Sequence, residues 1–251
     1  MPGLHLPGKT REQQGQKHSM DSIKEVVKMN NISFSDFYQE YLGLDDSMIC
    51  NDVRVCKCKY RDIPLNKRYY YKIIATKYNG ENILSYSPEF NETELRFLCT
   101  EINFETIGFG DIHKDLKLPQ YELSYMDRML LGTQIGVNAD KCSDCDRNNS
   151  IEYKYLEEYR KYIALINGDL VGYCKVSDVI SGYGNLVVWV EEPRRRLGIA
   201  ESLVKLMIKK CYEERIVPMY VVKTNNHASI SLAKKIGFQV KQRELVVSYT
   251  N

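Results

Sequence analysis

The residues in this chain best suited to chemistry form a short basic turn, residues 193–200, with the sequence Pro-Arg-Arg-Arg-Leu-Gly-Ile-Ala. An apolar run typical of a strand precedes the turn, and an amphipathic run typical of a helix follows it. The first amides of a helix have no intrahelical acceptor and lie at the positive end of the helix dipole, so they can bind an anion. Gly198 allows the main chain to approach a ligand closely, and the arginines add positive charge. The turn therefore predicts a site for a phosphate-rich ligand.

Two stretches of the C-terminal part resemble a known family. The spacing Arg195-x-x-Gly198-x-Ala200 is similar to the R/Q-x-x-G-x-G/A signature of the GNAT acetyltransferase superfamily, in which this turn holds the pyrophosphate of acetyl-CoA. A second signature follows in the family's order: a strand, then Asn226, a short helix and a Lys-apolar-Gly-Phe sequence that ends at Phe238. The resemblance covers about residues 150–251 and implies an acetyl-CoA-dependent transferase.

The resemblance also implies which residues hold acetyl-CoA as co-substrate. Backbone amides of the turn would bind the pyrophosphate, while the main chain at Trp189 and Val190 would pair with pantetheine like an added strand. The amide near Val190 is also the family's usual donor to the oxyanion, and Asn226 matches an asparagine that contacts the cofactor arm. The predicted cofactor-binding residues are Trp189, Val190, Arg195, Arg196, Leu197, Gly198, Ile199, Ala200, Asn226 and Ser229.

Acetyl transfer to an amine further requires that the amine lose a proton and that the oxyanion be stabilised. Glu191 and Glu192 follow the predicted strand and are candidates for the general base; alternatively they are exposed carboxylates that pair with the arginines. The family's tyrosine that protonates the departing thiolate corresponds here to Ala233, which has no proton to donate. Tyr220, Tyr249 or water would replace it, or the thiolate leaves unassisted. We therefore predict Glu191, Glu192 and Tyr249 as the catalytic residues.

Composition limits the other classes of function. The chain has 251 residues, 43% of them apolar, and a net charge of +2, so it can bury a sizeable core and has no general attraction for nucleic acid or a membrane surface. No apolar run reaches the length of a membrane span, and the N-terminus lacks the pattern of a secretory signal. We expect a cytoplasmic protein, monomer or homodimer, with a small-molecule amine as substrate and neither nucleic acid nor membrane as partner.

The cysteines allow two interpretations. Cys142-x-x-Cys145 together with Cys56-x-Cys58 could supply four sulfur ligands to zinc. The two pairs are far apart in sequence, and Cys-x-Cys is an uncommon zinc spacing. Free thiols are the usual state of cysteines in an intracellular chain of this size. We therefore predict no metal site.

The N-terminal part predicts a smaller α+β domain over residues 20–150, after a disordered arm or added leader over residues 1–19. Two roles are open for this domain: it shapes the substrate site, or it is a degenerate companion of the same fold. Ser33 and Asn91 are predicted helix caps, and Asn79-Gly80 is a hairpin signal. The expected elements are helices over residues 33–42, 91–101 and 121–131, strands over residues 53–60, 68–78 and 83–86, and a loop over residues 108–119.

The C-terminal part predicts a GNAT domain over residues 151–251, with the element order β-β-β-α-β-α-β. The fold class is therefore α/β (α+β), with a mixed, mostly antiparallel sheet flanked by helices. The expected strands cover residues 162–166, 170–177, 185–190, 218–223 and 245–249, the expected helices cover residues 199–212 and 229–235, and residues 152–160 are expected to be helical or irregular.

These predictions leave three functions open. The first is an acetyl-CoA-dependent N-acetyltransferase that moves an acetyl group to a primary amine of a small molecule by direct attack in a ternary complex. The second is a catalytically silent module that binds or senses CoA, suggested by Ala233. The third is acylation of a protein N-terminus or lysine. The sequence does not identify the acceptor.

Overall fold

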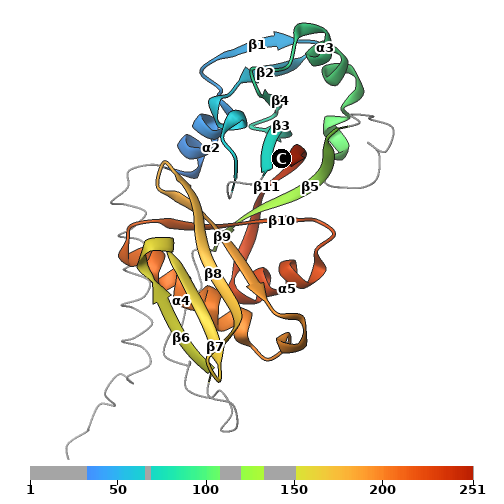
Figure 1. Cartoon of the computed structure of the whole chain (residues 1–251). Helices are drawn as coiled ribbons and strands as arrows, with labels where there is room; N and C mark the ends of the chain where they lie inside the picture. Colours follow the sequence, from blue (N-terminus) through green and yellow to red (C-terminus); the bar gives the residue numbers. More distant parts are fainter. Residues whose placement is uncertain (1–32, 66–68, 108–119, 133–150, 251) are drawn as a thin grey trace, which may run out of the picture.

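The computed structural model of the chain describes residues 33–65, 69–107, 120–132 and 151–250 (Figure 1). The predicted arm over residues 1–19 and the predicted loop over residues 108–119 lie outside the described residues. Cys142 and Cys145 also lie outside them, so the zinc hypothesis is not tested. Within the described parts, no helix has both the length and the apolar character that crossing a membrane requires.

The described strands form one sheet of eleven strands in the order β1-β2-β4-β3-β11-β5-β10-β9-β8-β7-β6. Most neighbouring pairs are antiparallel, while β2 pairs with β4, and β10 with β9, in parallel. The strands are β1 (Ser47–Cys50), β2 (Val53–Lys57), β3 (Tyr69–Tyr78), β4 (Glu81–Tyr86), β5 (Glu122–Leu131), β6 (Ile151–Leu156), β7 (Lys161–Ile166), β8 (Asp169–Ile180), β9 (Tyr183–Val190), β10 (Val217–Lys223) and β11 (Phe238–Thr250).

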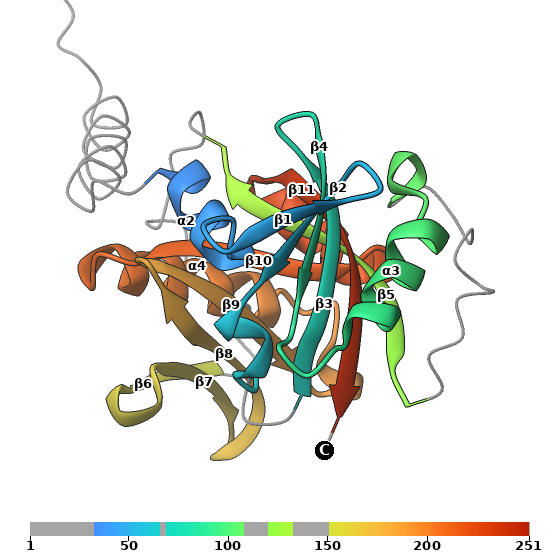
Figure 2. The ribbon, with the colours of Figure 1, turned by 90° about the horizontal axis from the view of Figure 1, so that it is seen from above.

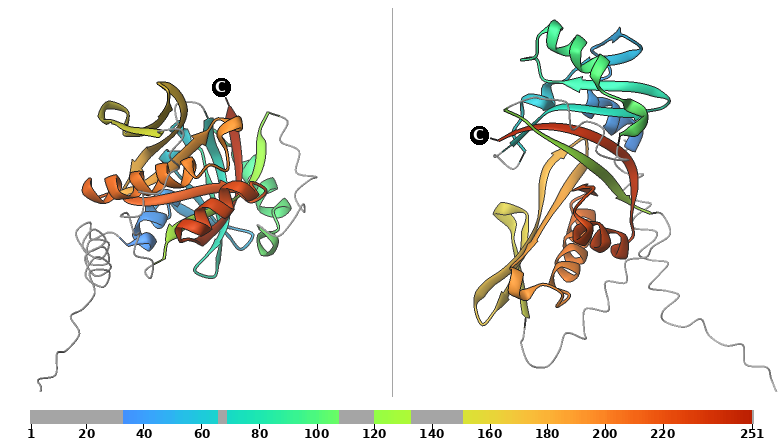
Figure 3. Two further views of the ribbon diagram at one scale, coloured as in Figure 1. Left: turned by 90° about the horizontal axis from the view of Figure 1, so that it is seen from below. Right: turned by 90° about the vertical axis from the view of Figure 1, so that its right-hand side faces the viewer.

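The sheet joins the N-terminal and C-terminal parts of the chain. The last strand, β11, pairs with β3 on one side and with β5 on the other, and β5 pairs in turn with β10. In the right-hand view of Figure 3, β5 and β11 are long curved strands that lie between the N-terminal strands and the part that contains α4 (Ile199–Glu213) and α5 (His227–Ile236). The predicted domain boundary at residues 150 and 151 therefore does not divide the sheet.

Four described helices cover the sheet: α2 (Phe34–Leu42), α3 (Glu92–Glu101), α4 (Ile199–Glu213) and α5 (His227–Ile236). Ser33 and Asn91 each form a capping box at the start of α2 and α3, which confirms both predicted caps. Seen from above, α2 and α3 lie on opposite sides of β3 and β4 (Figure 2). Their apolar faces belong to two separate cores, while α4 and α5 share a third core with the C-terminal strands.

Residues 121–131 correct the sequence prediction, because they form strand β5 rather than a helix. The run Met126–Leu130 is buried without alternation, since β5 lies between β10 and β11 and is covered on both faces. Two of its buried residues are charged, and both are paired with residues of β11: Asp127 with Arg243, and Arg128 with Glu244. From the sequence alone, a continuous apolar run that contains two charges can be either a central strand or a segment of a helix.

The other predictions differ less from the structure. Residues 152–160, expected to be helical or irregular, contain β6 and a short 3-10 helix, Glu157–Tyr159. The last strand is longer than predicted, because β11 begins directly after α5 at Phe238. The hairpin around Asn79-Gly80 is confirmed: β3 pairs with β4, and both turn residues have positive φ.

The six described cysteines are free thiols, as predicted for these positions. Burial raises the pKa of the Cys56 thiol to about 12 and that of Cys211 to about 12. In an unfolded chain a thiol ionises near pH 8.5, so the folded state holds more protons than the unfolded state between about pH 9 and 12. Among the described residues, no group of three His, Cys, Asp or Glu side chains is arranged to hold a metal ion.

We therefore expect the free energy of unfolding to be fully maintained at pH 8 and to fall as the pH rises above about 9. Urea denaturation curves recorded at pH 8, 9 and 10 measure this change. The decrease should be smaller in a Cys211→Ala variant, which removes one of the groups that ionise on unfolding. A free energy of unfolding that stays constant up to pH 10 would contradict the prediction.

Candidate functional site

The basic turn lies between β9 and α4, as the sequence predicts. After Val190 the chain forms a short 3-10 helix, Glu192–Arg194, and then reaches Gly198, which is the N-cap of α4. Gly198 has φ +78° and makes no side-chain cap, and Arg196 also has positive φ. The first helical amide with an acceptor is that of Ser202, which donates to the Gly198 carbonyl at 3.0 Å.

The amides of residues 196–201 form a group of unused donors. Across the described part of the chain, none of these amides has a hydrogen-bond acceptor. A Cβ placed on Gly198 would meet no heavy atom within 4 Å, so there is open space beside Gly198 itself. Successive unpaired amides at the positive end of a 15-residue helix are suited to a phosphate group.

The charged side chains of the turn are solvent-exposed. Arg195 donates from Nε to the Val190 carbonyl at 3.3 Å and lies 3.8 Å from Glu192. The main-chain amide of Glu191 donates to the carbonyl of Val171 in β8 at 2.9 Å, which fixes the position of its backbone. Glu191 and Glu192 are both exposed, and Glu192 is the one with an arginine nearby among the described residues; the role of either as general base stays a prediction.

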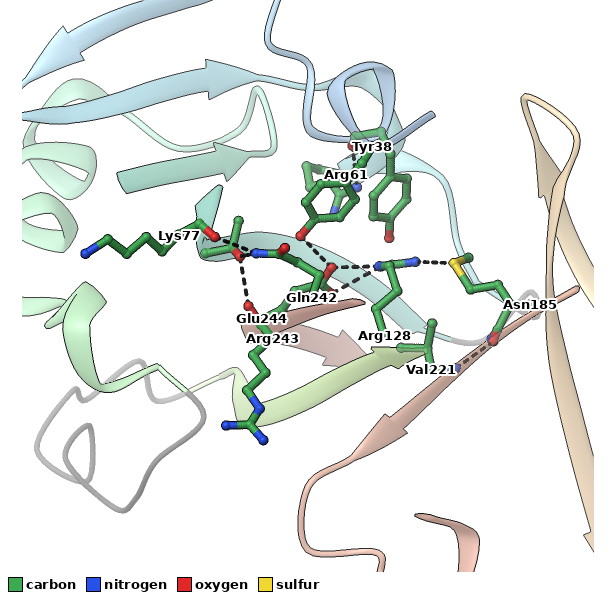
Figure 4. Close-up of polar contacts among 12 residues, drawn as sticks. Tyr38, Arg61, Lys77, Arg128, Asn185, Val221, Gln242, Arg243 and Glu244 are labelled. Carbon is green, nitrogen blue, oxygen red and sulfur yellow. Dashed lines mark hydrogen bonds and ion pairs between the residues drawn. The ribbon is translucent and has the colours of Figure 1, made fainter. Parts of the chain in front are cut away.

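Strands β9 and β10 separate shortly after they begin. Their parallel pairing is limited to three residue pairs, from Tyr183 opposite Val217 to Asn185 opposite Met219. At the point of separation the Asn185 side chain accepts the amide of Val221 through Oδ1 at 3.1 Å (Figure 4). A side-chain oxygen thus takes the place of a β9 carbonyl, and the two strands diverge beyond it.

The separation leaves one edge of β9 without a partner strand. The amide of Glu191 donates to β8, and residues of an antiparallel strand alternate between its two neighbours. The amides of Leu186, Val188 and Val190 therefore point away from β8. The Leu186 amide still belongs to the last pair that β9 makes with β10, so Val188 and Val190 are the residues whose amides face the gap between β9 and β10. This row of main-chain donors ends at the basic turn, so an extended ligand can pair with β9 and place an anionic end at Gly198.

A cavity of about 390 Å³ lies in the gap between the two strands. Its lining comes from both parts of the chain: Asn185, Leu186 and Val187 of β9, residues 220–223 of β10, and residues of β3, β5 and β11. Such a volume is in the range of small-molecule sites. The N-terminal part thus forms one wall of this cavity.

The structure places the predicted site residues in three groups. The main chain from Trp189 to Ala200 forms the open edge and the turn, and the Trp189 ring is 41% exposed and stacks on Tyr173. Asn226 and Ser229 line the cavity at the start of α5. Tyr249 lines a different pocket with Tyr121, on the side of β11 opposite the cavity-lining Ser248, so it is not brought together with the turn.

The residues at the start of α5 have structural partners. Asn226 is the N-cap of α5, and its Oδ1 accepts the Ser229 amide at 3.1 Å. The Ser229 hydroxyl lies 2.8 Å from the Tyr220 hydroxyl, and both residues line the cavity. Ala233, at the position of the family's tyrosine, is fully buried. Tyr220 is therefore the buried tyrosine hydroxyl that the structure brings to this site.

Sequence reasoning missed most residues of the cavity, Asn185 and Glu122 among them. Asn185 was assigned only to a strand, and no signal in the sequence marks its side chain as the group that ends the pairing of β9 with β10. Glu122 lies in the stretch that was predicted to be helical, and the structure places it in the cavity, where it forms an ion pair with Lys223. An exposed carboxylate at the end of a strand has no distinctive pattern.

Comparison with protein families finds a match for the part of the chain that contains the basic turn. Residues 137–238 match the model of the family described as "Acetyltransferase (GNAT) family". A search of curated proteins found no match.

Solved structures with partial similarity include three acetyltransferases. The GCN5-related N-acetyltransferase-like protein of Streptococcus suis is 13% identical with a TM-score of 0.45, covering 68% of this chain and 79% of its own. A GNAT-family acetyltransferase from Colwellia psychrerythraea is 12% identical with a TM-score of 0.40, covering 66% and 76%. A GCN5-related N-acetyltransferase from Sphaerobacter thermophilus is 14% identical with a TM-score of 0.38, covering 57% of each chain. At these values the solved structures carry no argument. The likeness rests on the family model, and residues 137–238, which include both sequence signatures, match the GNAT acetyltransferase family.

Proposed function

We propose that this protein is an acetyl-CoA-dependent N-acetyltransferase that acts on a primary amine of a small molecule. The observation that carries the proposal is a series of main-chain donors in two groups: the amides of Val188 and Val190 at the open edge of β9, and the amides of residues 196–201 in the turn that follows. A diphosphate joined to an extended amide-containing arm fits such a series. A phosphate alone would need only the turn.

The described residues fit acetyl-CoA in two respects. The amides beside Gly198 are unpaired and open to solvent, as a pyrophosphate requires. The amides of Val188 and Val190 face the gap, where pantetheine would pair as an added strand. When bound, acetyl-CoA supplies an activated acetyl group as a thioester. The chain's contribution is to hold the thioester and the amine together and to donate the Val190 amide to the oxyanion.

Tyr220 is proposed as the proton donor to the departing thiolate, in place of the tyrosine that the family carries where this chain has Ala233. Its hydroxyl lies in the cavity, bonded to Ser229. Burial raises the pKa of Tyr220, and the Ser229 hydroxyl lowers it to a smaller extent. The phenol therefore remains protonated at neutral pH and is able to donate.

Replacement of Tyr220 by phenylalanine should lower kcat by about 10²-fold, the lower end of the range for a positioned general acid. Affinity for acetyl-CoA, measured by calorimetry, should stay the same, because the arm would be held by main-chain groups. Tyr212→Phe is the control, since it removes a phenol hydroxyl from α4 at a residue that does not line the cavity. An unchanged kcat in Tyr220→Phe would mean that water protonates the thiolate.

A catalytically silent CoA-binding protein is the second candidate, because Ala233 is buried and supplies no acid. Two measurements separate the candidates. Calorimetric titration with acetyl-CoA tests the site that they share, and amine-dependent release of CoA thiol tests the transferase alone. Absence of saturable acetyl-CoA binding would disprove both. Binding without thiol release for any amine in a broad panel would leave the silent module.

A further inference from the structure

The cavity between β9 and β10 contains little charge. Among the described residues that line it, Glu122 and Lys223 are the charged ones, and they form an ion pair with each other. The remaining polar groups are hydroxyls and amides, such as those of Ser124, Ser248 and Asn185. The net charge of the lining is therefore zero, with a single carboxylate available to a cation.

The cavity has an aromatic wall. Tyr69 and Tyr71 of β3 line it, with ring centroids 5.7 Å apart. The same two tyrosines also line an adjoining cavity of about 30 Å³, where Phe37, Tyr41 and Tyr183 extend the aromatic surface. Flat rings on one wall favour a ligand with an apolar or aromatic body.

The sheet fixes the position of Glu122 relative to this wall. In the β5–β11 pairing Glu122 lies opposite Ser248 and Ser124 opposite Val246, and all four residues line the cavity. The Ser248 hydroxyl donates to the main-chain oxygen of Glu122 at 3.2 Å. The carboxylate thus extends from a paired strand of the N-terminal part, at the end of the cavity where Lys223 completes β10.

We infer that the acceptor is a monoamine with an aromatic or apolar body, whose amino group is received by Glu122 and whose body packs on Tyr69 and Tyr71. This inference rests on the proposed function. Glu122 acts as the general base, a role that the sequence had assigned to Glu191 and Glu192, neither of which lines the cavity. The acceptor's ammonium group would compete with Lys223 for the carboxylate.

The chemical step balances with these groups. The bound ammonium first loses one proton to the Glu122 carboxylate, which passes it to solvent and leaves a neutral amine. The amine nitrogen then bonds to the acetyl carbon and gives a second proton to the Glu122 carboxylate, while the bond between that carbon and sulfur breaks. The thiolate takes a proton from the Tyr220 hydroxyl, which regains one from solvent, and Glu122 releases its proton to solvent. The sum is an ammonium ion and a thioester converted to an amide, a thiol and a released proton.

Polyamines and aminoglycosides do not match this site. Each carries several positive charges, whereas the described lining of the cavity offers one carboxylate. With one carboxylate in the lining, the second and third charges of such an acceptor would have no partner there. We therefore expect aralkylamines, which carry one positive charge, to be acceptors, and polycationic amines not to be.

The test compares three acceptors on the full chain: 2-phenylethylamine, spermidine and kanamycin. We expect kcat/KM for 2-phenylethylamine to exceed that of either polycation at least tenfold. In Glu122→Gln, kcat/KM for 2-phenylethylamine should fall about 10²-fold. Calorimetric affinity for 2-phenylethylamine should weaken, and that for acetyl-CoA should stay the same.

Glu105→Gln provides a matched control. Glu105 pairs with Lys77 at a site away from the cavity, and the side chains of that pair are 71% and 43% exposed, against 62% and 45% for Glu122 and Lys223. The control should keep wild-type kcat/KM. Preference for spermidine or kanamycin, no transfer to 2-phenylethylamine, or full activity in Glu122→Gln overturns the inference while acetyl-CoA binding still stands. Loss of wild-type acetyl-CoA binding overturns the proposed function itself.

Discussion

A Gly198→Glu variant is expected to lose acetyl-CoA binding, with an affinity at least 10²-fold lower than that of the wild type, or about 2.7 kcal/mol. The new carboxylate would stand in front of the unpaired amides of residues 196–201, where it repels phosphate and competes for the same donors. The space at Gly198 accepts a side chain without a clash, so the effect should arise from charge and blocked approach rather than from misfolding. Isothermal titration calorimetry with acetyl-CoA measures it.

Gly168→Glu is the control for backbone strain. Gly168, in the turn between β7 and β8, has φ +89° and, like Gly198, has no heavy atom within 4 Å of a built Cβ. Both variants therefore place the same side chain on a left-handed residue in open space. The Gly168 variant should bind acetyl-CoA as the wild type does. Equal loss of affinity in the two variants, or full affinity in Gly198→Glu, would show that the turn does not hold the phosphates.

The sequence predicts the fold best where a local signal fixes the chain. Capping boxes at Ser33 and Asn91 and the Asn79-Gly80 turn depend on neighbouring residues, and all three occur in the structure. Residues 121–131 were wrongly predicted to be a helix, because the polar partners of Asp127 and Arg128 lie more than a hundred residues away in β11. The insertion of β5 between β10 and β11 is a long-range pairing that no local pattern encodes.

The candidate site likewise has one part that depends on neighbouring residues and one part that depends on long-range strand pairing. The turn at Gly198 belongs to one strand–turn–helix unit, so its residue types and spacing suffice to predict it. The cavity depends on where β9 separates from β10 and on which strands of the N-terminal part lie beside them. Glu122 and Tyr69 reach the cavity only through the pairing of β5 and β3 with β11. Residues that long-range strand pairing brings to a site cannot be identified from one sequence.

Replacing Glu244 by glutamine is expected to lower the free energy of unfolding by about 3–5 kcal/mol. Glu244 and Arg128 are both buried and form a bidentate pair, with Arg128 Nε and Nη2 at 2.7 and 3.1 Å from the two carboxylate oxygens (Figure 4). Burial lowers the pKa of Arg128, but the Glu244 carboxylate, together with Tyr41 and Tyr38, outweighs this effect and holds the pKa above its ordinary value. Without that carboxylate the guanidinium remains charged in the core with no countercharge. Urea denaturation at pH 7 measures the loss.

The Arg54–Glu81 pair makes a stringent control, because it has the same bidentate geometry, with distances of 2.9 and 2.8 Å, but lies at the surface. Glu81→Gln should cost about 0–1 kcal/mol, since water screens an exposed pair. The double variant Arg128→Met with Glu244→Met should be more stable than Glu244→Gln, because it removes the unpaired charge along with its partner. If Glu244→Gln cost no more than Glu81→Gln, the buried pair would contribute no more to the free energy of unfolding than the exposed one, although Glu244 also accepts the Tyr38 hydroxyl of α2 at 2.8 Å.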